Sequence, residues 1–154
     1  MSLRATLTAI DRCLSVAVSA ADLDGCRQAI SDRRVEWLAL ISLANRYLVA
    51  PALWTTLSRP ELGQEVPEDV QDYLALLHKR NACRNARIRQ QCLEIGSILM
   101  KRGLSAVLLK GTAWLFDGSF VSDRMMQDID LLVAHDSLEP AVDALVASGY
   151  GDTG

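Results

Sequence analysis

The chain has 154 residues, enough for about one domain that buries roughly 70% of its unfolded surface. Half of the residues are apolar and 23% are charged, which excludes a disordered chain. The net charge of −3 is unevenly distributed, with 14 Lys and Arg against 11 Asp and Glu in residues 1–105, and 2 against 8 in residues 106–154.

Over the first hundred residues, apolar positions recur three and four apart, which predicts an almost wholly helical region. The first predicted helix covers 3–20. Asp11 and Arg12 interrupt its apolar residues, so we expect an amphipathic helix rather than a signal or membrane-spanning segment, and hence a cytoplasmic protein. A second helix begins at Asp22, an N-cap residue, and a third covers 32–47.

Proline and glycine mark the remaining boundaries of the helical region. Pro51 is expected to break or kink the third helix, leaving 52–57 as its continuation. Residues 58–66 predict a loop. Pro67, followed by two acidic residues, opens a long helix over 68–102, and the glycine that follows this helix is its expected C-cap.

The long predicted helix carries most of the basic excess. The residues along one face of this helix are apolar at both ends and polar in the middle. Each apolar end is expected to pack in a different part of the protein, so one helix joins two parts. The basic side chains are interpreted either as a solvated face or as a basic wall facing phosphates. These residues are Lys79, Arg80, Arg84, Arg87, Arg89, Lys101 and Arg102.

The cysteines and histidines form no metal-binding pattern. Because no CxxC pair occurs and no histidine lies at ligand spacing, we expect reduced thiols in the core rather than a zinc site. His78 and His135 are interpreted as single surface or core residues outside the functional site. The cysteines are Cys13, Cys26, Cys83 and Cys92.

The pattern changes after the long helix. Residues 106–109 predict a buried strand, followed by a Gly-Thr turn, a short helix, a second strand over 128–133 and a helix over 137–148. This alternation predicts a mixed sheet with flanking helices. The expected fold class is α+β, with a helical region 1–104 and a partial α/β core 105–154. Glycines at the end predict a frayed terminus.

Two aspartates alternate with apolar residues in the second predicted strand. Side chains along a strand have a period of two, so Asp128 and Asp130 would point one way while Ile129 and Leu131 point the other. Two carboxylates on one face repel unless a cation lies between them, and their oxygens suit Mg²⁺ or Mn²⁺. The pair therefore predicts a divalent-metal site.

Lys110, Gly111 and Thr112 directly follow the first predicted strand and precede apolar residues of helical character. Glycine permits close backbone approach, and the N–H groups at a helix start favour an anion. The Thr112 hydroxyl would add a contact to a phosphate. Lys110 either contacts a phosphate as well or only ends the strand.

In this order, these residues resemble the nucleotidyltransferases of the polymerase-β superfamily, over roughly residues 106–150. The likeness is to uncharacterised bacterial members with a Lys-Gly turn, an arginine four residues before the first aspartate, here Arg124, and a Leu-Leu-Val ending. The resemblance implies that Asp128 and Asp130 hold two divalent metals and that Gly111 and Thr112 cradle phosphates. It further implies transfer of a nucleoside monophosphate from an NTP to an acceptor.

Arg124 would either pair with a phosphate or hold Asp128 in place.

Two features depart from the superfamily pattern. The fifteen residues between Thr112 and Asp128 exceed the usual spacing, so an extra helix or loop is expected there. The superfamily's third carboxylate, which lies on a later strand, has no good counterpart, so we expect a fragment of a longer protein, inactive or incomplete as this chain.

Two other hypotheses stay open. The chain could be a non-catalytic module that retains the fold, with its long basic helix presenting a surface to a partner protein or a second copy. The basic helix could instead contact nucleic acid, but it lacks the interleaved aromatic residues that stack on bases, so we do not expect a nucleic-acid partner.

Overall fold

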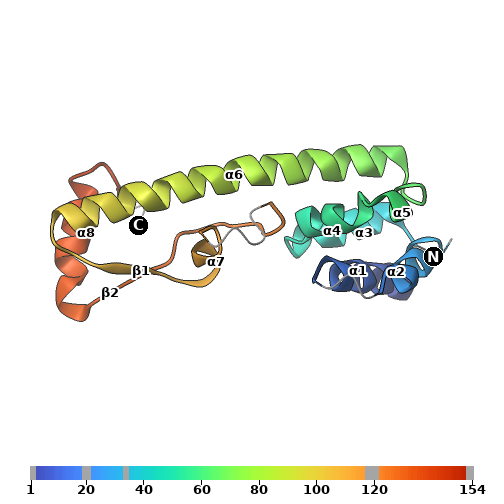
Figure 1. The fold of residues 1–154 in the computed structure, drawn as a ribbon, viewed down its shortest axis with the longest axis horizontal. Helices are drawn as coiled ribbons and strands as arrows, with labels where there is room; N and C mark the ends of the chain where they lie inside the picture. The colour runs from blue at the N-terminus through green and yellow to red at the C-terminus, as the bar shows by residue number, and fades with distance from the viewer. Residues whose placement is uncertain (1–2, 19–21, 33–34, 117–121, 152–154) are drawn as a thin grey trace. The chain divides into compact units, whose positions relative to one another are not determined.

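The computed structural model of the chain describes residues 3–18, 22–32, 35–116 and 122–151. It is mostly helical with a two-stranded antiparallel sheet, which confirms the α+β class but not the predicted mixed sheet (Figure 1). The chain divides into two compact units. The first is Met1–Cys83 with Ser122–Met125, and the second is Arg84–Val121 with Met126–Gly154.

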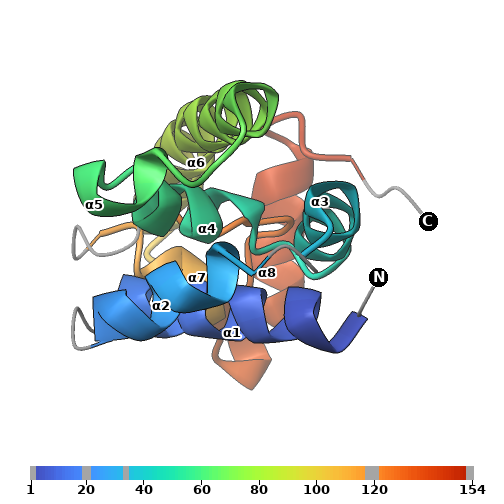
Figure 2. The same cartoon turned by 90° about the vertical axis from the view of Figure 1, so that its right-hand side faces the viewer.

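The first unit is built from short helices packed on the beginning of a long one. Helix α1 contacts α2, α3 and α4, and Figure 2 shows α1 and α2 lying side by side. Their buried apolar side chains form one core, which explains the apolar spacing seen in the sequence. The helices are α1 (Leu3–Val18), α2 (Leu23–Ile30), α3 (Trp37–Arg46), α4 (Ala50–Leu57) and α5 (Pro60–Gly63).

Local backbone geometry sets where α2 and α3 begin. The carboxylate of Asp22 accepts a hydrogen bond from the backbone N–H of Gly25 at 3.2 Å, which confirms Asp22 as an N-cap. Helix α3 starts at Trp37, five residues later than predicted. Glu36, its N-cap, is extended (φ −100°, ψ 106°), so the chain before Trp37 is not helical.

The break between α3 and α4 lies before Pro51. Leu48 adopts a positive φ of 60°, and the N–H of Val49 donates to the carbonyl of Ala44 at 2.9 Å, a helix-ending pattern. Pro51 lies in the first turn of α4, where its missing N–H leaves no hydrogen bond unmade. Pro60 begins α5 in the same way, so the predicted loop 58–66 contains a short helix.

Helix α6 (Glu68–Lys101) matches the predicted long helix. Gly103 has φ +69°, and the N–H of Leu104 donates to the carbonyl of Leu99 at 3.0 Å, which confirms the predicted glycine C-cap. Leu74 belongs to the core of the first unit and Leu99 to that of the second, so this helix does serve two parts of the protein. The seven basic side chains named above are all exposed.

The second unit packs the end of α6 against α8 (Leu138–Val146) and a sheet of β1 (Ala106–Leu108) and β2 (Leu131–Val133). A 3-10 turn, η2 (His135–Ser137), precedes α8. Gly149 has φ +94°, and the N–H of Tyr150 donates to the carbonyl of Leu145 at 3.0 Å. Tyr150 also packs against this core, so the predicted fraying is wrong for the described end.

Of the four cysteines, Cys13, Cys26 and Cys92 are buried as predicted, whereas Cys83 is exposed on α6. All four are free thiols. In the part of the chain that the structure describes, none of the helices has the combination of length and apolarity that a membrane crossing requires.

Candidate functional site

Pairing of β1 with β2 brings the Lys-Gly-Thr turn beside Asp130. The strands pair in the register Ala106↔Val133, and the ladder is extended by a hydrogen bond of 2.9 Å from the N–H of Leu109 to the carbonyl of Asp130. Lys110 Nζ then lies 3.1 Å from Asp130 Oδ1. Two of the predicted site residues, Lys110 and Asp130, are 20 residues apart in sequence and are therefore brought into contact by the sheet.

The two aspartates precede β2 instead of lying within it. The predicted strand 128–133 is too long, because β1 supplies only three paired residues and its last pair is Leu108↔Leu131. The predicted alternation is nevertheless seen in which side chains pack in the core and which remain exposed. Ile129 and Leu131 pack in the core, whereas Asp128 is exposed and the Asp130 side chain keeps 30% of its exposure.

Lys110 begins helix α7 (Lys110–Ala113), so the helix starts at the Gly-Thr turn rather than after it. The φ of Lys110 is +52°, a left-handed conformation that a side chain with a Cβ disfavours by roughly 1–2 kcal/mol. Strain of this kind is concentrated at functional sites. Its ammonium supplies Asp130 with a positive charge, the role that the sequence prediction gives to a metal.

Gly111 and Thr112 are both buried in α7. Thr112 Oγ1 donates to the carbonyl of Leu109 at 2.7 Å, so the hydroxyl proton is used within the turn. A phosphate contact from this turn would therefore come from the N–H groups at the start of α7 and from Lys110. The hydroxyl of Thr112 instead stabilises the turn itself.

Arg124 lies in the first unit, whereas Lys110, Gly111, Thr112, Asp128 and Asp130 lie in the second. Its carbonyl accepts a hydrogen bond from Asn81 Nδ2 at 3.0 Å. The same amide donates to the carbonyl of Ser122 at 2.7 Å, so one buried side chain of α6 holds the backbone of this segment. Between Thr112 and Asp128, Ala113 ends α7, the other described residues form turns, a bend and irregular chain, and residues 117–121 lie outside the description.

A polar cluster around Asp123 was not predicted from the sequence. Asp123 Oδ1 accepts hydrogen bonds from Thr55 Oγ1 at 2.7 Å and from Ser122 Oγ at 3.2 Å. His78 Nε2 lies 3.3 Å from the same oxygen, and this histidine stays outside the predicted site residues. The sequence offers no signal for this cluster, because its members are brought together only by the packing of the first unit.

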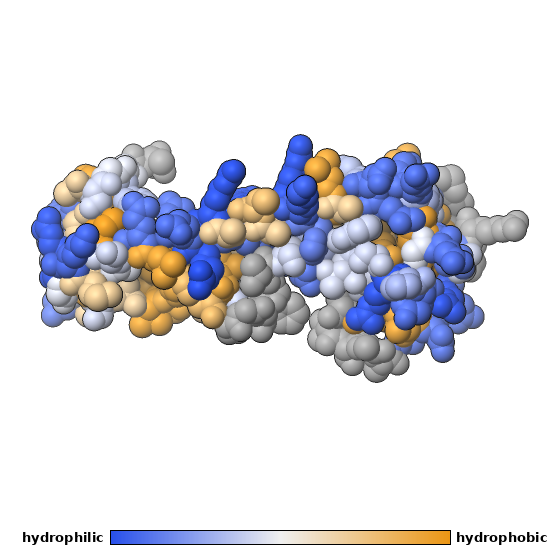
Figure 3. All heavy atoms as spheres, turned by 45° about the horizontal axis from the view of Figure 1, so that its top comes forward, coloured by the Kyte–Doolittle hydropathy of each residue, from blue (hydrophilic) through white to orange (hydrophobic). Residues whose placement is uncertain are grey.

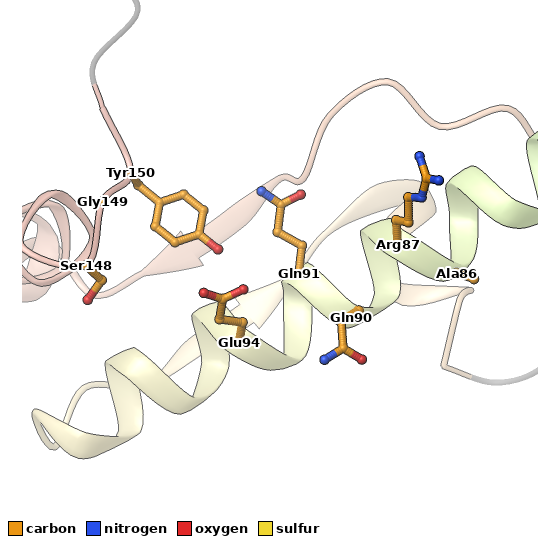
Figure 4. Close-up of a pocket in the computed structure, with 8 residues that line it drawn as sticks. All are labelled: Ala86, Arg87, Gln90, Gln91, Glu94, Ser148, Gly149 and Tyr150. Atoms are coloured by element: carbon orange, nitrogen blue, oxygen red, sulfur yellow. The ribbon is translucent and has the colours of Figure 1, made fainter.

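An open groove of about 590 Å³ lies between α6 and the residues that follow α8 (Figure 4). Burial raises the pKa of Tyr150, and the nearby carboxylate of Glu94 raises it further. The groove contains none of the predicted site residues, but it does include Arg87 of the basic set. Its lining residues are Ala86, Arg87, Gln90, Gln91, Glu94, Ser148, Gly149 and Tyr150.

The carboxylates of Asp128 and Asp130 fit Mg²⁺ in chemical type, because both offer hard oxygen atoms outside the apolar core. Within the described ranges, no three His, Cys, Asp or Glu side chains gather into a metal-ligating group. Mg²⁺ is usually held by one or two carboxylates together with water and substrate phosphates. Two protein ligands are therefore compatible with a metal that arrives with a nucleotide.

Comparison with known proteins adds one finding. Residues 33–154 match the profile of a family described as uncharacterised nucleotidyltransferase. The match includes α3 to α6, so the relationship extends well beyond the likeness over residues 106–150. No curated protein and no solved structure matches the chain. Since the matched segment covers most of the sequence, the chain belongs to the uncharacterised nucleotidyltransferase family.

Proposed function

We propose that the second unit contributes a site for a Mg²⁺-nucleoside triphosphate, from which a nucleoside monophosphate is transferred to an acceptor hydroxyl or phosphate. One observation carries the proposal: the β1–β2 pairing sets the Lys-Gly-Thr turn beside an acidic side chain, with Lys110 Nζ 3.1 Å from Asp130 Oδ1. Anion-binding and cation-binding groups are then adjacent, as a metal-bound phosphate requires. Family membership supports the reaction class.

Each residue has a distinct proposed role. Asp128 and Asp130 would hold Mg²⁺ or Mn²⁺, and a bound divalent ion would neutralise phosphate charge and orient the reacting phosphate. Lys110 would exchange its contact with Asp130 for a contact with a phosphate oxygen. Backbone N–H groups of Gly111 and Thr112 would donate to the same phosphates.

Calorimetric titration of the full chain with ATP, GTP, CTP and UTP, each with and without Mg²⁺, tests the proposal. We expect Mg²⁺-dependent binding of at least one nucleotide. Asp128→Asn and Asp130→Asn should each weaken it by ~10-fold or more, since each removes a charged metal ligand. The matched controls are Asp136→Asn and Asp143→Asn, which alter exposed carboxylates of the same unit and should bind as the unchanged chain does.

Nucleotide binding that is equal in all four variants would contradict the assignment of the site, and so would binding that is indifferent to Mg²⁺. If binding behaves as expected, transfer of a radiolabelled nucleoside monophosphate to candidate acceptors then identifies the acceptor. Asp128→Asn and Asp130→Asn serve as the negative controls of this transfer assay.

A non-catalytic interaction module is the second candidate, and the exposed face of the sheet favours it. Val107 and Leu132 pair directly across the strands and are 59% and 55% exposed. Figure 3 shows hydrophobic atoms gathered in the region of β1, β2 and α7. Such a face is typical of an interaction surface. If the chain is such a module, light scattering should detect self-association that Leu132→Thr abolishes. Calorimetry should then detect no Mg²⁺-dependent nucleotide binding.

A further inference from the structure

Two buried thiols of the first unit lie within reach of each other. Cys13 of α1 and Cys26 of α2 are both 0% exposed, and their Sγ atoms are 3.1 Å apart. A disulfide has an S–S distance of about 2.05 Å, so a closing movement of about 1 Å would form the bond. We propose that Cys13 and Cys26 are a redox-active dithiol that a small-molecule disulfide converts to a disulfide joining α1 to α2.

The contacts around the pair already hold the two helices together. Arg12, next to Cys13, forms an ion pair with Asp22, the N-cap of α2. Thr56 Oγ1 of α4 donates to the carbonyl of Cys13 at 2.8 Å. The helix positions that bring the sulfurs together are therefore set by interactions that do not involve the sulfurs.

The two sulfurs are not equivalent. The two thiols share one hydrogen bond in which either can be the donor, and this contact raises the pKa of Cys13 and lowers that of Cys26. The charge of Arg59 also lowers the pKa of Cys26, against the opposing effects of burial and of Asp22. Because the thiolate is the nucleophile, Cys26 is the sulfur that attacks first.

Oxidation by glutathione disulfide proceeds in two exchanges. The Cys26 thiolate attacks one sulfur of glutathione disulfide, forming a mixed disulfide and releasing one glutathione thiolate. Cys13, once deprotonated, attacks Sγ of Cys26 and releases the second. The protein loses two electrons and two protons, and two molecules of reduced glutathione are formed. Since both sulfurs are buried, each exchange requires local separation of α1 and α2 and is slower than reaction at exposed Cys83.

Tryptic peptide mapping of the full chain tests the proposal. Cleavage after Arg12 and Arg27 places both cysteines in one peptide, residues 13–27, while Cys83 and Cys92 fall in the separate peptides 81–84 and 90–101. After equilibration with oxidised glutathione and alkylation under denaturing conditions, we expect peptide 13–27 to lack both alkyl groups and to be lighter than the dithiol by two hydrogens. Dithiothreitol should restore double alkylation.

Two variants test whether both sulfurs are needed, with Cys92→Ala as the matched control for loss of a buried thiol. Cys13→Ala and Cys26→Ala each remove the partner thiol, so neither should form the internal disulfide and oxidation should stop at a glutathione adduct of the remaining cysteine. Cys92→Ala should keep the oxidised 13–27 peptide. Oxidation of the unchanged chain should raise the melting temperature by on the order of 10 °C, because the bond removes loop-closure entropy from the unfolded chain.

Full double alkylation of peptide 13–27 after equilibration with the oxidant would overturn the proposal. So would adducts on both cysteines without an internal disulfide. These peptide measurements do not depend on either variant folding, since the unchanged chain alone decides between the outcomes.

Discussion

Lys110 combines an unfavourable backbone conformation with an ion pair to Asp130. Its positive φ of +52° costs roughly 1–2 kcal/mol relative to glycine. The ion pair recovers little of this cost, because the lysine side chain is 70% exposed and exposed pairs contribute about 0–1 kcal/mol. A lysine at this position is therefore explained better by a binding role than by stability.

Replacing Lys110 by glycine should separate these two effects. We expect Lys110→Gly to leave the free energy of unfolding unchanged or to raise it by about 1 kcal/mol, because it relieves the backbone strain. The same change should weaken Mg²⁺-nucleotide binding by ~10-fold, because it removes a charged phosphate contact. Urea denaturation and calorimetry measure the two quantities.

Lys101→Gly, in the last turn of α6, is the matched control. It should lower the free energy of unfolding by up to about 1 kcal/mol and leave nucleotide binding unchanged. A Lys110→Gly protein that is clearly less stable than the unchanged chain, or that binds nucleotide equally well, would refute this account of Lys110.

Asp123 is the central acceptor of the polar cluster in the first unit. Asp123→Ala should lower the free energy of unfolding by about 1–3 kcal/mol, because Thr55 and Ser122 both lose the acceptor of their hydroxyl groups. Asp72→Ala, at an exposed position of α6, should change it by no more than about 0.5 kcal/mol. Equal denaturation midpoints for the two variants would show that the cluster has no stabilising role.

At the scale of secondary structure, the helix ends that depend on short-range chemistry could be predicted from the sequence. Asp22 and Gly103 act as the expected caps, and α6 follows Pro67 as expected. The start of α3 and the end before Pro51 could not be predicted, because Glu36 and Leu48 take up conformations for which their side chains carry no signal. The strand predicted over 128–133 is too long because the length of β2 is set by its pairing with β1, which forms only in the folded chain.

Gly25 and Gly96 should respond differently to replacement by alanine. An alanine Cβ at Gly96 meets nothing within 4 Å, so Gly96→Ala should raise the free energy of unfolding by about 0.5–1 kcal/mol through helix propensity. A Cβ at Gly25 would lie within 2.3 Å of the Asp22 carboxylate that caps α2. Gly25→Ala should therefore give no gain, since loss of the cap costs about 1 kcal/mol. Thermal denaturation that shows equal stabilisation by both changes would contradict this explanation of the cap.

At the scale of the whole chain, helices precede the two strands as predicted. The two compact units divide within α6, between Cys83 and Arg84, near the polar stretch in the middle of its apolar stripe. The candidate site was predicted residue by residue from the order of its motif. The contact between Lys110 and Asp130 was not, because it depends on strand register and on the left-handed backbone of Lys110. The Asp123 cluster and the Tyr150 groove likewise arise only from folding.

The central claim is that Asp128 and Asp130 hold a divalent cation beside the turn at Gly111. Titration of the isotopically labelled chain with Mn²⁺, followed by NMR, tests it most directly, because a paramagnetic ion broadens the amide signals of nearby residues only. We predict that the signals of residues 109–112 and 128–131 broaden first, and that Asp130→Asn removes this effect. First or equal broadening at other acidic segments, such as the start of α6 at Glu68 and Asp69, would contradict the claim.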